Sequence, residues 1–433
     1  MKYYSTNNKN ELVDFKTALL TGLASDGGLY LPECIPELSK SFLDDLPNYS
    51  IQEIAFHISS KFIGDEINEN ELQKIIQSSI SFPAPLVSLN KNLSVLELFH
   101  GPTLAFKDFG ARFMARTMEY FLKDEDDELN ILVATSGDTG SAVASGFLGV
   151  KGIRVFVLYP SGKVSKIQEQ QFTTLGKNIQ AIEIDGTFDD CQKIVKEAFV
   201  DKEIIGRKKM SSANSINIAR LIPQTFYYFE AAKNNMHNDD QLVFCVPSGN
   251  FGNLTAGLFA KKMGLPIHKF IAATNGNDVF PKYLHSGTFT PMASIKTYSN
   301  AMDVGNPSNL QRINDLFNND VSLIKSVIYS KSFSDENTIS AIAEIKDKFN
   351  YTIDPHGAVG YLAAESYKNE IDGNSKIVIL ETAHPAKFSD VVEKAVGKTV
   401  LLPSRLEECL SRKKLSTKLS NDYKDFKEYF IHS

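Results

Sequence analysis

One lysine stands among apolar and aromatic residues in the segment Phe99-His100-Gly101-Pro102-Thr103-Leu104-Ala105-Phe106-Lys107-Asp108-Phe109-Gly110. Apolar surroundings remove water from a lysine amine, and a desolvated amine loses its proton more easily. A neutral amine attacks an aldehyde and forms a Schiff base. The same residues also suit a structural lysine whose stem packs on apolar neighbours, or whose ammonium pairs with Asp108 or Glu97. From this segment alone, the structural interpretation of Lys107 is favoured.

A second feature is a loop of small residues between an apolar run, Leu242–Val246, and a helical pattern near Leu254. Backbone N–H groups at the start of a helix converge on anions. The sequence therefore predicts a phosphate site made by Ser248, Gly249, Asn250, Phe251, Gly252 and Asn253. Neither G-x-G-x-x-G nor G-x-x-x-x-G-K-[ST] is present, so a single phosphate fits better than a dinucleotide or a nucleoside triphosphate. Taken alone, such a turn is more often a tight connection than a ligand site.

A comparable loop follows the apolar run Ile131–Ala134 and leads into a helix near Ser141. Its donors suit a carboxylate or a ring oxygen of a ligand, and the residues concerned are Thr135, Ser136, Gly137, Asp138 and Thr139. The loop lacks the G-x-S-x-G pattern of a hydrolase nucleophile. Helix capping by Ser136 or Asp138 explains the same residues equally well.

Alternating strand and helix patterns predict the elements that position these loops. Four continuous apolar runs, each followed by a loop and a helix, favour an α/β fold with parallel sheets buried on both faces; they are 131–134, 154–158, 242–246 and 377–380. Ligands bind beyond the carboxyl ends of such strands. Helical spacing before Pro83 predicts a helical N-terminal domain, residues 1–90, ahead of a catalytic region, 91–400, and a helical C-terminal extension, 401–433. A smaller subdomain is expected at about residues 110–235.

Composition narrows the functional class. The 433 residues carry a formal net charge of −6, which offers no footprint for nucleic acid. No run of apolar residues is long enough for a membrane helix, and the N-terminal residues have neither signal-peptide nor transit-peptide features, so we expect a cytoplasmic protein. Four scattered cysteines give no metal-ligand spacing, and no metal is expected. Small-molecule chemistry is the class that remains.

Six ordered motifs carry a family resemblance. They are Glu97–Asp108 and Ala134–Gly140, Ser212-Ala213-Asn214-Ser215-Ile216-Asn217, Pro247–Gly252, Asn300-Ala301-Met302-Asp303-Val304, and Thr382-Ala383-His384-Pro385-Ala386-Lys387-Phe388. Through them the chain resembles bacterial and fungal threonine synthases, which are fold-type II pyridoxal-phosphate enzymes, over nearly its whole length. The resemblance implies two parallel-sheet α/β subdomains, as in the tryptophan synthase β-subunit, with a helical N-terminal domain.

The resemblance also implies roles for single residues. Lys107 corresponds to the Schiff-base lysine, the loop from Ser248 to Asn253 to the site of the cofactor phosphate, and Thr382 to the partner of the pyridine nitrogen. Members of the family often have Asp where this chain has Asn253. The implied reaction converts O-phospho-L-homoserine and water to L-threonine and phosphate by γ-elimination and β-addition, the last step of threonine biosynthesis. A threonine dehydratase-like lyase and a non-catalytic phospho-ligand-binding relative are the alternatives.

Substrate contacts are less clearly indicated. The candidates for the substrate phosphate are Lys163, Arg112, Asn214 and Asn217, because cations and amides suit a departing dianion. His100, His356 and His384 have the chemistry to aid proton transfer, or to serve as structural hydrogen-bonding residues. Lys387 is interpreted as structural or as a charge near an anion. The resemblance favours a monomer, with a homodimer as the alternative.

Overall fold

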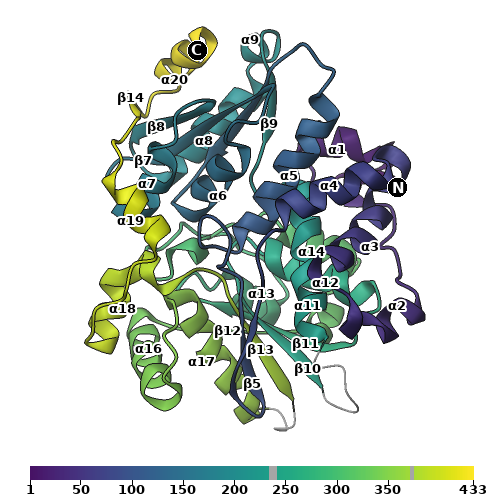
Figure 1. Cartoon of the computed structure of the whole chain (residues 1–433), viewed down its shortest axis with the longest axis vertical. Helices are drawn as coiled ribbons and strands as arrows, with labels where there is room; N and C mark the ends of the chain where they lie inside the picture. The colour runs from purple at the N-terminus through teal and green to yellow at the C-terminus, as the bar shows by residue number, and fades with distance from the viewer. Residues whose placement is uncertain (234–240, 371–374) are drawn as a thin grey trace.

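Two parallel sheets form the centre of the molecule (Figure 1). The computed structural model describes residues 1–233, 241–370 and 375–433. The larger sheet has the order β12 (Ile328–Ser332), β11 (Ile267–Thr274), β10 (Leu242–Pro247), β13 (Lys376–Glu381), β5 (Leu93–Glu97), β4 (Leu86–Asn90). Its neighbouring strands are parallel except for β4, which runs antiparallel to β5.

The smaller sheet is parallel throughout and lies above the larger one in Figure 1. Its order is β14 (Thr417–Ser420), β8 (Ile179–Asp185), β7 (Ile153–Pro160), β6 (Leu129–Ala134), β9 (Lys209–Ser212). Strands β6, β7, β10 and β13 contain the four apolar runs recognised in the sequence, so the predicted α/β fold with two parallel-sheet subdomains is confirmed.

Inner strands such as β6 and β10 are buried on both faces, which explains why they are continuously apolar. In β10, Phe244 and Val246 enter one hydrophobic core, whereas Val243 and Cys245 enter another on the opposite face. Helix α17 (Pro355–Glu370) covers β10, β11 and β13, and helix α8 (Phe188–Val200) packs on β6 and β7. Helices α5 (Lys107–Leu122) and α6 (Asp138–Phe147) pack against each other between the candidate loops.

Further helices and short turns complete the structure. They are α7 (Lys166–Thr173), α9 (Lys202–Ile205), α10 (Ile218–Leu221), α11 (Phe226–Ala232), α12 (Gly252–Lys262), α13 (Val279–Ser286), α14 (Leu310–Leu316), α15 (Val321–Val327), α16 (Asp335–Phe349) and α18 (Ser389–Val396), with 3-10 turns at Leu46–Asn48, Gly64–Glu66, Ile222–Gln224, Asn300–Met302 and Pro385–Phe388. Within the described ranges, no helix is both long and apolar enough to cross a membrane.

The N-terminal region contains more than the predicted helices. Helices α1 (Phe15–Thr21), α2 (Lys40–Asp44), α3 (Ile51–Ile63) and α4 (Glu69–Ser79) are present, and the α3 residues Ile54 and Ile58 are fully buried. The region also contains a small antiparallel sheet that was not predicted, in which β1 (Tyr3–Ser5) pairs with β2 (Asn8–Val13) and β3 (Tyr30–Pro32). Strand β2 is polar and mostly exposed, so it lacks the apolar alternation that identifies a strand.

The C-terminal segment contains a strand in addition to the predicted helices. Between α19 (Ser404–Ser411) and α20 (Tyr423–His432), strand β14 pairs in parallel with β8 and completes the edge of the smaller sheet. In Figure 1 the segment runs from α18, beside the larger sheet, to α20, beside the smaller one. Lys414 fastens it by contacts of 2.6 Å to both Glu169 and Glu183.

Candidate active site

The segment that carries Lys107 is held against the end of β13. The Phe106 N–H donates to Thr382 O at 2.9 Å, and the His384 N–H donates to Leu104 O at 3.1 Å. Leu104 has φ +57°, which turns the chain sharply just before this pairing. Lys107 and Thr382 therefore lie at the carboxyl edge of the larger sheet, where parallel α/β sheets bind ligands.

The side chain of Asp108 shapes the turn and does not pair with Lys107. Its two carboxylate oxygens accept from Thr103 N at 2.8 Å and Thr103 Oγ1 at 2.7 Å. A Cβ on Gly101 would lie 2.4 Å from Asp108 Oδ2, so only glycine fits there. The nearest carboxylate to Lys107 is that of Asp138, with Nζ and Oδ2 4.0 Å apart. The proposed ion pair of Lys107 with Asp108 is thus not formed.

Lys107 is an unusually acidic lysine. Its side chain is only 16% exposed, and burial lowers the pKa of its amine to about 8. Asp138 acts in the opposite direction, while the cations of Lys387 and Arg220 lower the pKa further. An amine with this pKa is neutral in a substantial fraction of molecules near neutral pH, as a nucleophile or general base requires.

The predicted phosphate loop lies between β10 and α12. Ser248 N–H donates to Ala273 O at 2.8 Å, and Phe251 has φ +59° immediately before α12 begins. A Cβ on Gly249 would lie 2.8 Å from Met302 Cα, so the loop requires glycine for this close approach. Asn250 is tied to the following segment, because its Oδ1 accepts from Ser308 N at 2.9 Å.

Asn253 supplies an unused donor at the start of α12. Its Oδ1 accepts from the hydroxyls of Tyr227 at 2.6 Å and Tyr228 at 2.8 Å. The amide is buried, and its Nδ2 has no hydrogen-bond partner among the described residues. Buried donors are rarely left unpaired unless a ligand or water completes them. This arrangement fits an anion held near the start of the helix.

The loop before α6 is shaped by its own side chains. Thr135 Oγ1 accepts from Gly137 N at 3.0 Å and Gly140 N at 2.8 Å, and Gly137 has φ +146°. Helix α6 starts after Gly137 without a side-chain cap from that residue, so the capping roles considered for Ser136 and Asp138 are not observed. Asp138 instead accepts from Gln168 Nε2 at 2.9 Å and pairs with Lys387 at 2.6 Å.

The predicted substrate-phosphate residues separate into two groups. Arg112 donates to Ser79 O at 2.8 Å and to Ser78 O at 2.5 Å, and Asn217 Nδ2 donates to Leu19 O at 2.8 Å. These two side chains are bonded to backbone of the N-terminal region in the structure, and their contact with the substrate stays a prediction. Asn214 keeps a buried, unpartnered Oδ1 in the described part of the chain, and Lys163 is exposed in the loop after β7.

Arg220 was not anticipated from the sequence. It is 3% exposed, donates through Nη1 to Ala213 O, and leaves its Nε without a partner within the described ranges. A Cβ on Gly110 would lie 2.8 Å from Arg220 Nε, so α5 packs directly on the guanidinium. The signal available in the sequence was its place one turn of helix beyond the Ser212–Asn217 motif.

A buried arginine, Arg312, joins the N-terminal region to the Ser212–Asn217 motif and to Asn309. Its Nε donates to Tyr30 O at 3.0 Å, and its Nη atoms donate to Ser215 O at 3.1 Å, Ile216 O at 2.6 Å and Asn309 Oδ1 at 2.7 Å. Burial lowers the pKa of this guanidinium to about 9. The Arg312 side chain therefore holds the backbone of Tyr30 against that of Ser215 and Ile216.

The three histidines differ in their surroundings. His356 is buried, with Nδ1 2.9 Å from Asp354 Oδ2 and Nε2 accepting from Ala301 N at 3.1 Å, so both ring nitrogens have structural partners. His384 accepts from Ala386 N through Nδ1, and burial lowers its pKa to about 4. His100 lies 2.8 Å from Glu97 Oε2 and is partly exposed.

Acidic residues cluster behind Thr382. Glu381 is fully buried and accepts from Asp354 N at 2.7 Å through Oε1, while its Oε2 has no partner among the residues described. Burial and the nearby charges of Asp354 and Glu97 raise the pKa of Glu381 well above its usual value. Its surroundings therefore favour the protonated form of this carboxyl.

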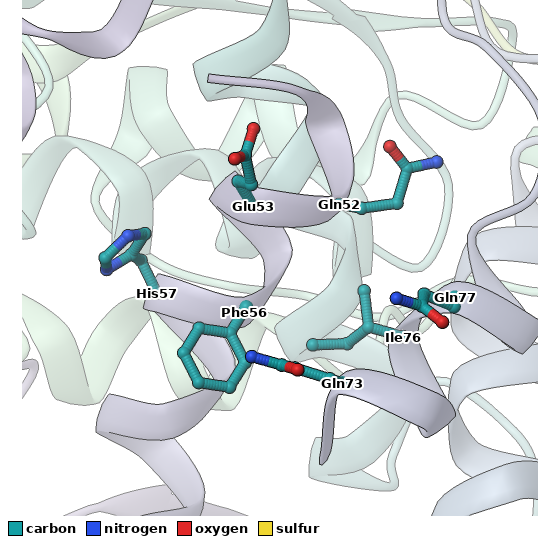
Figure 2. Close-up of a pocket in the computed structure, with 7 residues that line it drawn as sticks. All are labelled: Gln52, Glu53, Phe56, His57, Gln73, Ile76 and Gln77. Atoms are coloured by element: carbon teal, nitrogen blue, oxygen red, sulfur yellow. The ribbon is translucent and has the colours of Figure 1, made fainter. Parts of the chain in front are cut away.

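A separate cavity lies in the N-terminal region and takes no part in this site. Figure 2 shows its lining side chains on α3 and α4, and its volume is about 260 Å³. The lining residues are Gln52, Glu53, Phe56, His57, Gln73, Ile76 and Gln77. Residues of the lysine segment and of the two loops are absent from this lining.

Comparisons with known proteins agree with the geometry. The model of pyridoxal-phosphate dependent enzymes matches residues 81–383, and models of the threonine synthase N terminus and C-terminal region match residues 2–80 and 357–430. The chain is 45% identical to threonine synthase of Escherichia coli over 424 residues, covering 98% of this chain and 97% of that protein. The chain belongs to the threonine synthase family of pyridoxal-phosphate-dependent enzymes. The predicted family is thereby confirmed.

Other members of the threonine synthase family match almost as completely. The Saccharomyces cerevisiae threonine synthase is 37% identical, with 91% of this chain and 89% of that protein covered. The crystal structure of the Escherichia coli enzyme superposes with a TM-score of 0.93 over the whole of both chains, at 43% identity. A structure of threonine synthase from Brucella melitensis with bound pyridoxal phosphate has the same TM-score at 38% identity, covering 100% of this chain and 99% of that one.

The residues present fit the cofactor of this threonine synthase family. A pyridoxal phosphate requires an amine, an anion site and a partner for its ring nitrogen. The low-pKa amine of Lys107, the orphaned Asn253 Nδ2 and the glycine-dependent loop at Gly249 supply the first two. Thr382 lies beside Lys107 through the 106–382 hydrogen bond and supplies a hydroxyl.

Proposed function

We propose that the chain converts O-phospho-L-homoserine and water to L-threonine and phosphate as a cytoplasmic monomer. The observation that carries the proposal is a largely buried, low-pKa lysine next to Thr382 in a chain whose N-terminal, central and C-terminal regions all match this family. When bound, pyridoxal phosphate supplies an electron sink for the negative charge that develops on substrate carbon. Every proton transfer must then be assigned to the chain itself.

Lys107 would hold the cofactor and, once released from it, move protons. Its amine would take the proton from the substrate α-carbon and return protons to carbon later, because a pKa of about 8 lets it act in both directions near neutral pH. Thr382 would hold the ring nitrogen through a neutral hydroxyl. Burial lowers the pKa of His384 to about 4, so its imidazole ring is neutral near neutral pH. This disfavours His384 as a proton donor.

Two regions would bind the substrate. The backbone N–H groups at the start of α6, in the loop from Thr135 to Thr139, would take its carboxylate. Arg220 and Asn214 would face its phosphate, because Arg220 has an unpartnered Nε and Asn214 an unpartnered Oδ1, each in the described part of the chain. The amide oxygen can accept from a protonated phosphate or from water. Phosphate leaves the γ-carbon and water adds at the β-carbon, so one phosphate appears for each threonine.

The test measures both products of purified protein loaded with pyridoxal phosphate. Equal amounts of phosphate and threonine are expected from O-phospho-L-homoserine, and Lys107→Ala should abolish both. Phosphate with 2-oxobutyrate as the main product would instead identify a dehydratase-like lyase, and ligand binding without turnover would identify a non-catalytic relative. Size-exclusion chromatography with light scattering tests the monomer.

The substrate-phosphate assignment has its own matched pair of variants. Arg220→Lys should raise the KM for phospho-homoserine, because the lost fork of donors faces the substrate phosphate. Arg112→Lys is the control, since the Arg112 guanidinium is bonded to the carbonyls at the end of α4. An equal rise of KM in both variants would refute the assignment of Arg220.

A further inference from the structure

The Asp138 carboxylate lies between two lysines. Lys387 Nζ is 2.6 Å from Asp138 Oδ1, whereas Lys107 Nζ is 4.0 Å from Asp138 Oδ2, beyond hydrogen-bond reach. Asp138 begins α6 in the smaller subdomain, and Lys387 lies in the turn after β13 of the larger one. One carboxylate thus has a close cation and a distant one.

Lys387 is held in place by more than the ion pair. Its Nζ also donates to Thr103 O at 2.9 Å, in the turn that leads to Lys107. The side chain of Lys387 is completely buried, and that of Asp138 is 4% exposed. Gln168 Nε2 adds a third contact to the pair through Asp138 Oδ1, at 2.9 Å. A buried lysine with such partners has little freedom to move to another carboxylate.

We propose that Lys387 is a positioning residue that occupies the Asp138 carboxylate and so leaves the Lys107 amine free to lose its proton. Without Lys387, the buried charge of Asp138 would have Lys107 as its only close cation among the residues that the structure describes, and it would hold Lys107 as an ammonium. An ammonium cannot attack a carbonyl carbon or accept a proton. The proposal deepens the proposed function, on which its catalytic meaning rests.

The charges around Lys107 and Asp138 shift the pKa values of both side chains in the directions that this role of Lys387 requires. Burial lowers the pKa of Lys107 to about 8, Asp138 and Asp354 raise it, and Lys387 and Arg220 lower it. Burial alone would raise the pKa of Asp138, but Lys387 and Lys107 hold it well below its usual range. Asp138 is therefore ionised near neutral pH. The cation that pairs with its carboxylate then determines how strongly Asp138 raises the pKa of Lys107.

The experiment measures the proton on Lys107 directly in full-length protein freed of cofactor. Trace acetylation followed by mass spectrometry gives the pH midpoint of Lys107 reactivity, and stopped-flow absorbance gives the rate at which added pyridoxal phosphate is captured. Lys387→Met should raise the midpoint and slow capture at neutral pH about tenfold for each unit of the shift. Lys387→Arg should restore most of both quantities, because it restores the cation.

Two further variants keep the test decisive if Lys387→Met does not fold. Asp138→Asn should lower the midpoint of Lys107, and the double variant Asp138→Asn/Lys387→Met should return it towards the wild-type value. Lys414→Met is the matched control, because Lys414 also forms close ion pairs, with Glu169 and Glu183, but at the edge of the smaller sheet. An unchanged or lower midpoint in folded Lys387→Met overturns the proposal, as does an unchanged or higher one in Asp138→Asn.

These measurements use no amino-acid substrate. The proposal about Lys387 can therefore be overturned independently of the proposed reaction. A wrong product in the phospho-homoserine assay would leave the Lys107 midpoints intact. Shifted midpoints with the correct product support both proposals. Unshifted midpoints with the correct product overturn the role of Lys387 alone.

Discussion

Replacing Glu381 with glutamine should give a stability advantage over the wild-type protein, and this advantage should grow as the pH rises. Glutamine keeps the oxygen that accepts from Asp354 N and removes a carboxyl whose pKa is raised in the folded state by burial, Asp354 and Glu97. A raised pKa contributes stability that is complete below the unfolded value and is lost as the pH rises towards the folded value. Glutamine does not titrate, so this loss disappears in the variant.

The size of this stability difference follows from one proton that Glu381 binds in the folded state and releases in the unfolded state. Such a difference costs about 1.4 kcal/mol for each pH unit, or roughly 3 kcal/mol between about pH 5.5 and about pH 7.5 if Glu381 stays protonated. The advantage of Glu381→Gln should grow by that amount over this window. It should be smallest at the acidic end, where both chains carry a neutral group.

Calorimetry of both proteins across this pH window measures the effect as a difference in thermal midpoint, because a chain with two subdomains has no single two-state free energy. Infrared spectra should also lose one carboxylic-acid band in the variant. Glu336→Gln is the control: a hydrogen bond from Ser334 lowers the pKa of this exposed carboxyl, so folded and unfolded chains bind no proton there in this window and the midpoint difference should not change with pH. A midpoint difference for Glu381→Gln that does not change with pH would show that Glu381 is ionised in the folded protein.

Three other substitutions test the remaining parts of the site. Gly249→Ala should weaken pyridoxal phosphate binding at least tenfold, about 1.4 kcal/mol, because its Cβ would lie 2.8 Å from Met302 Cα. Gly252→Ala is the control and should bind the cofactor normally, because the nearest atom to its Cβ would be 3.4 Å away. Equal losses of affinity in a fluorescence titration of the two variants would refute this prediction. Arg312→Met should lower the urea concentration at which half of the protein is unfolded, since four oxygens lose their buried donor, a loss that costs about 3–5 kcal/mol. An unchanged urea midpoint contradicts this. Thr382→Val should reduce kcat and shift the absorbance of the bound cofactor while Thr382→Ser preserves both, and a normal spectrum in Thr382→Val would exclude a contact to the ring.

The parallel strands and the loops that follow them could be predicted from the sequence because their signals are local. A buried strand such as β10 is apolar at every position, and the turn at Gly249 shows its small residues directly. Lys107 was identifiable for the same reason, although only the accompanying motifs made a catalytic interpretation the better one. Family membership followed from the order of those motifs.

What escaped prediction depends on contacts between residues distant in sequence. Arg112 bonds to α4 because the N-terminal region packs on α5, and nothing in its own segment reveals the side on which its guanidinium lies. Arg220 is buried only because Gly110 admits it. The pairing of Lys387 with Asp138 joins two subdomains and cannot be read from either motif. Strand β2 was missed because its exposed polar residues do not alternate.

The late arrival of β14 has a consequence during synthesis. Strand β8 lies at the edge of the smaller sheet until Thr417–Ser420 pairs with it, and four of the six strands of the larger sheet are encoded between the two. The nascent smaller subdomain therefore exposes the backbone groups of β8 while the ribosome makes the other half of the enzyme. An uncovered strand edge recruits foreign strands. Chaperones that shield such edges have their opportunity in that interval, which the pairing of β14 closes.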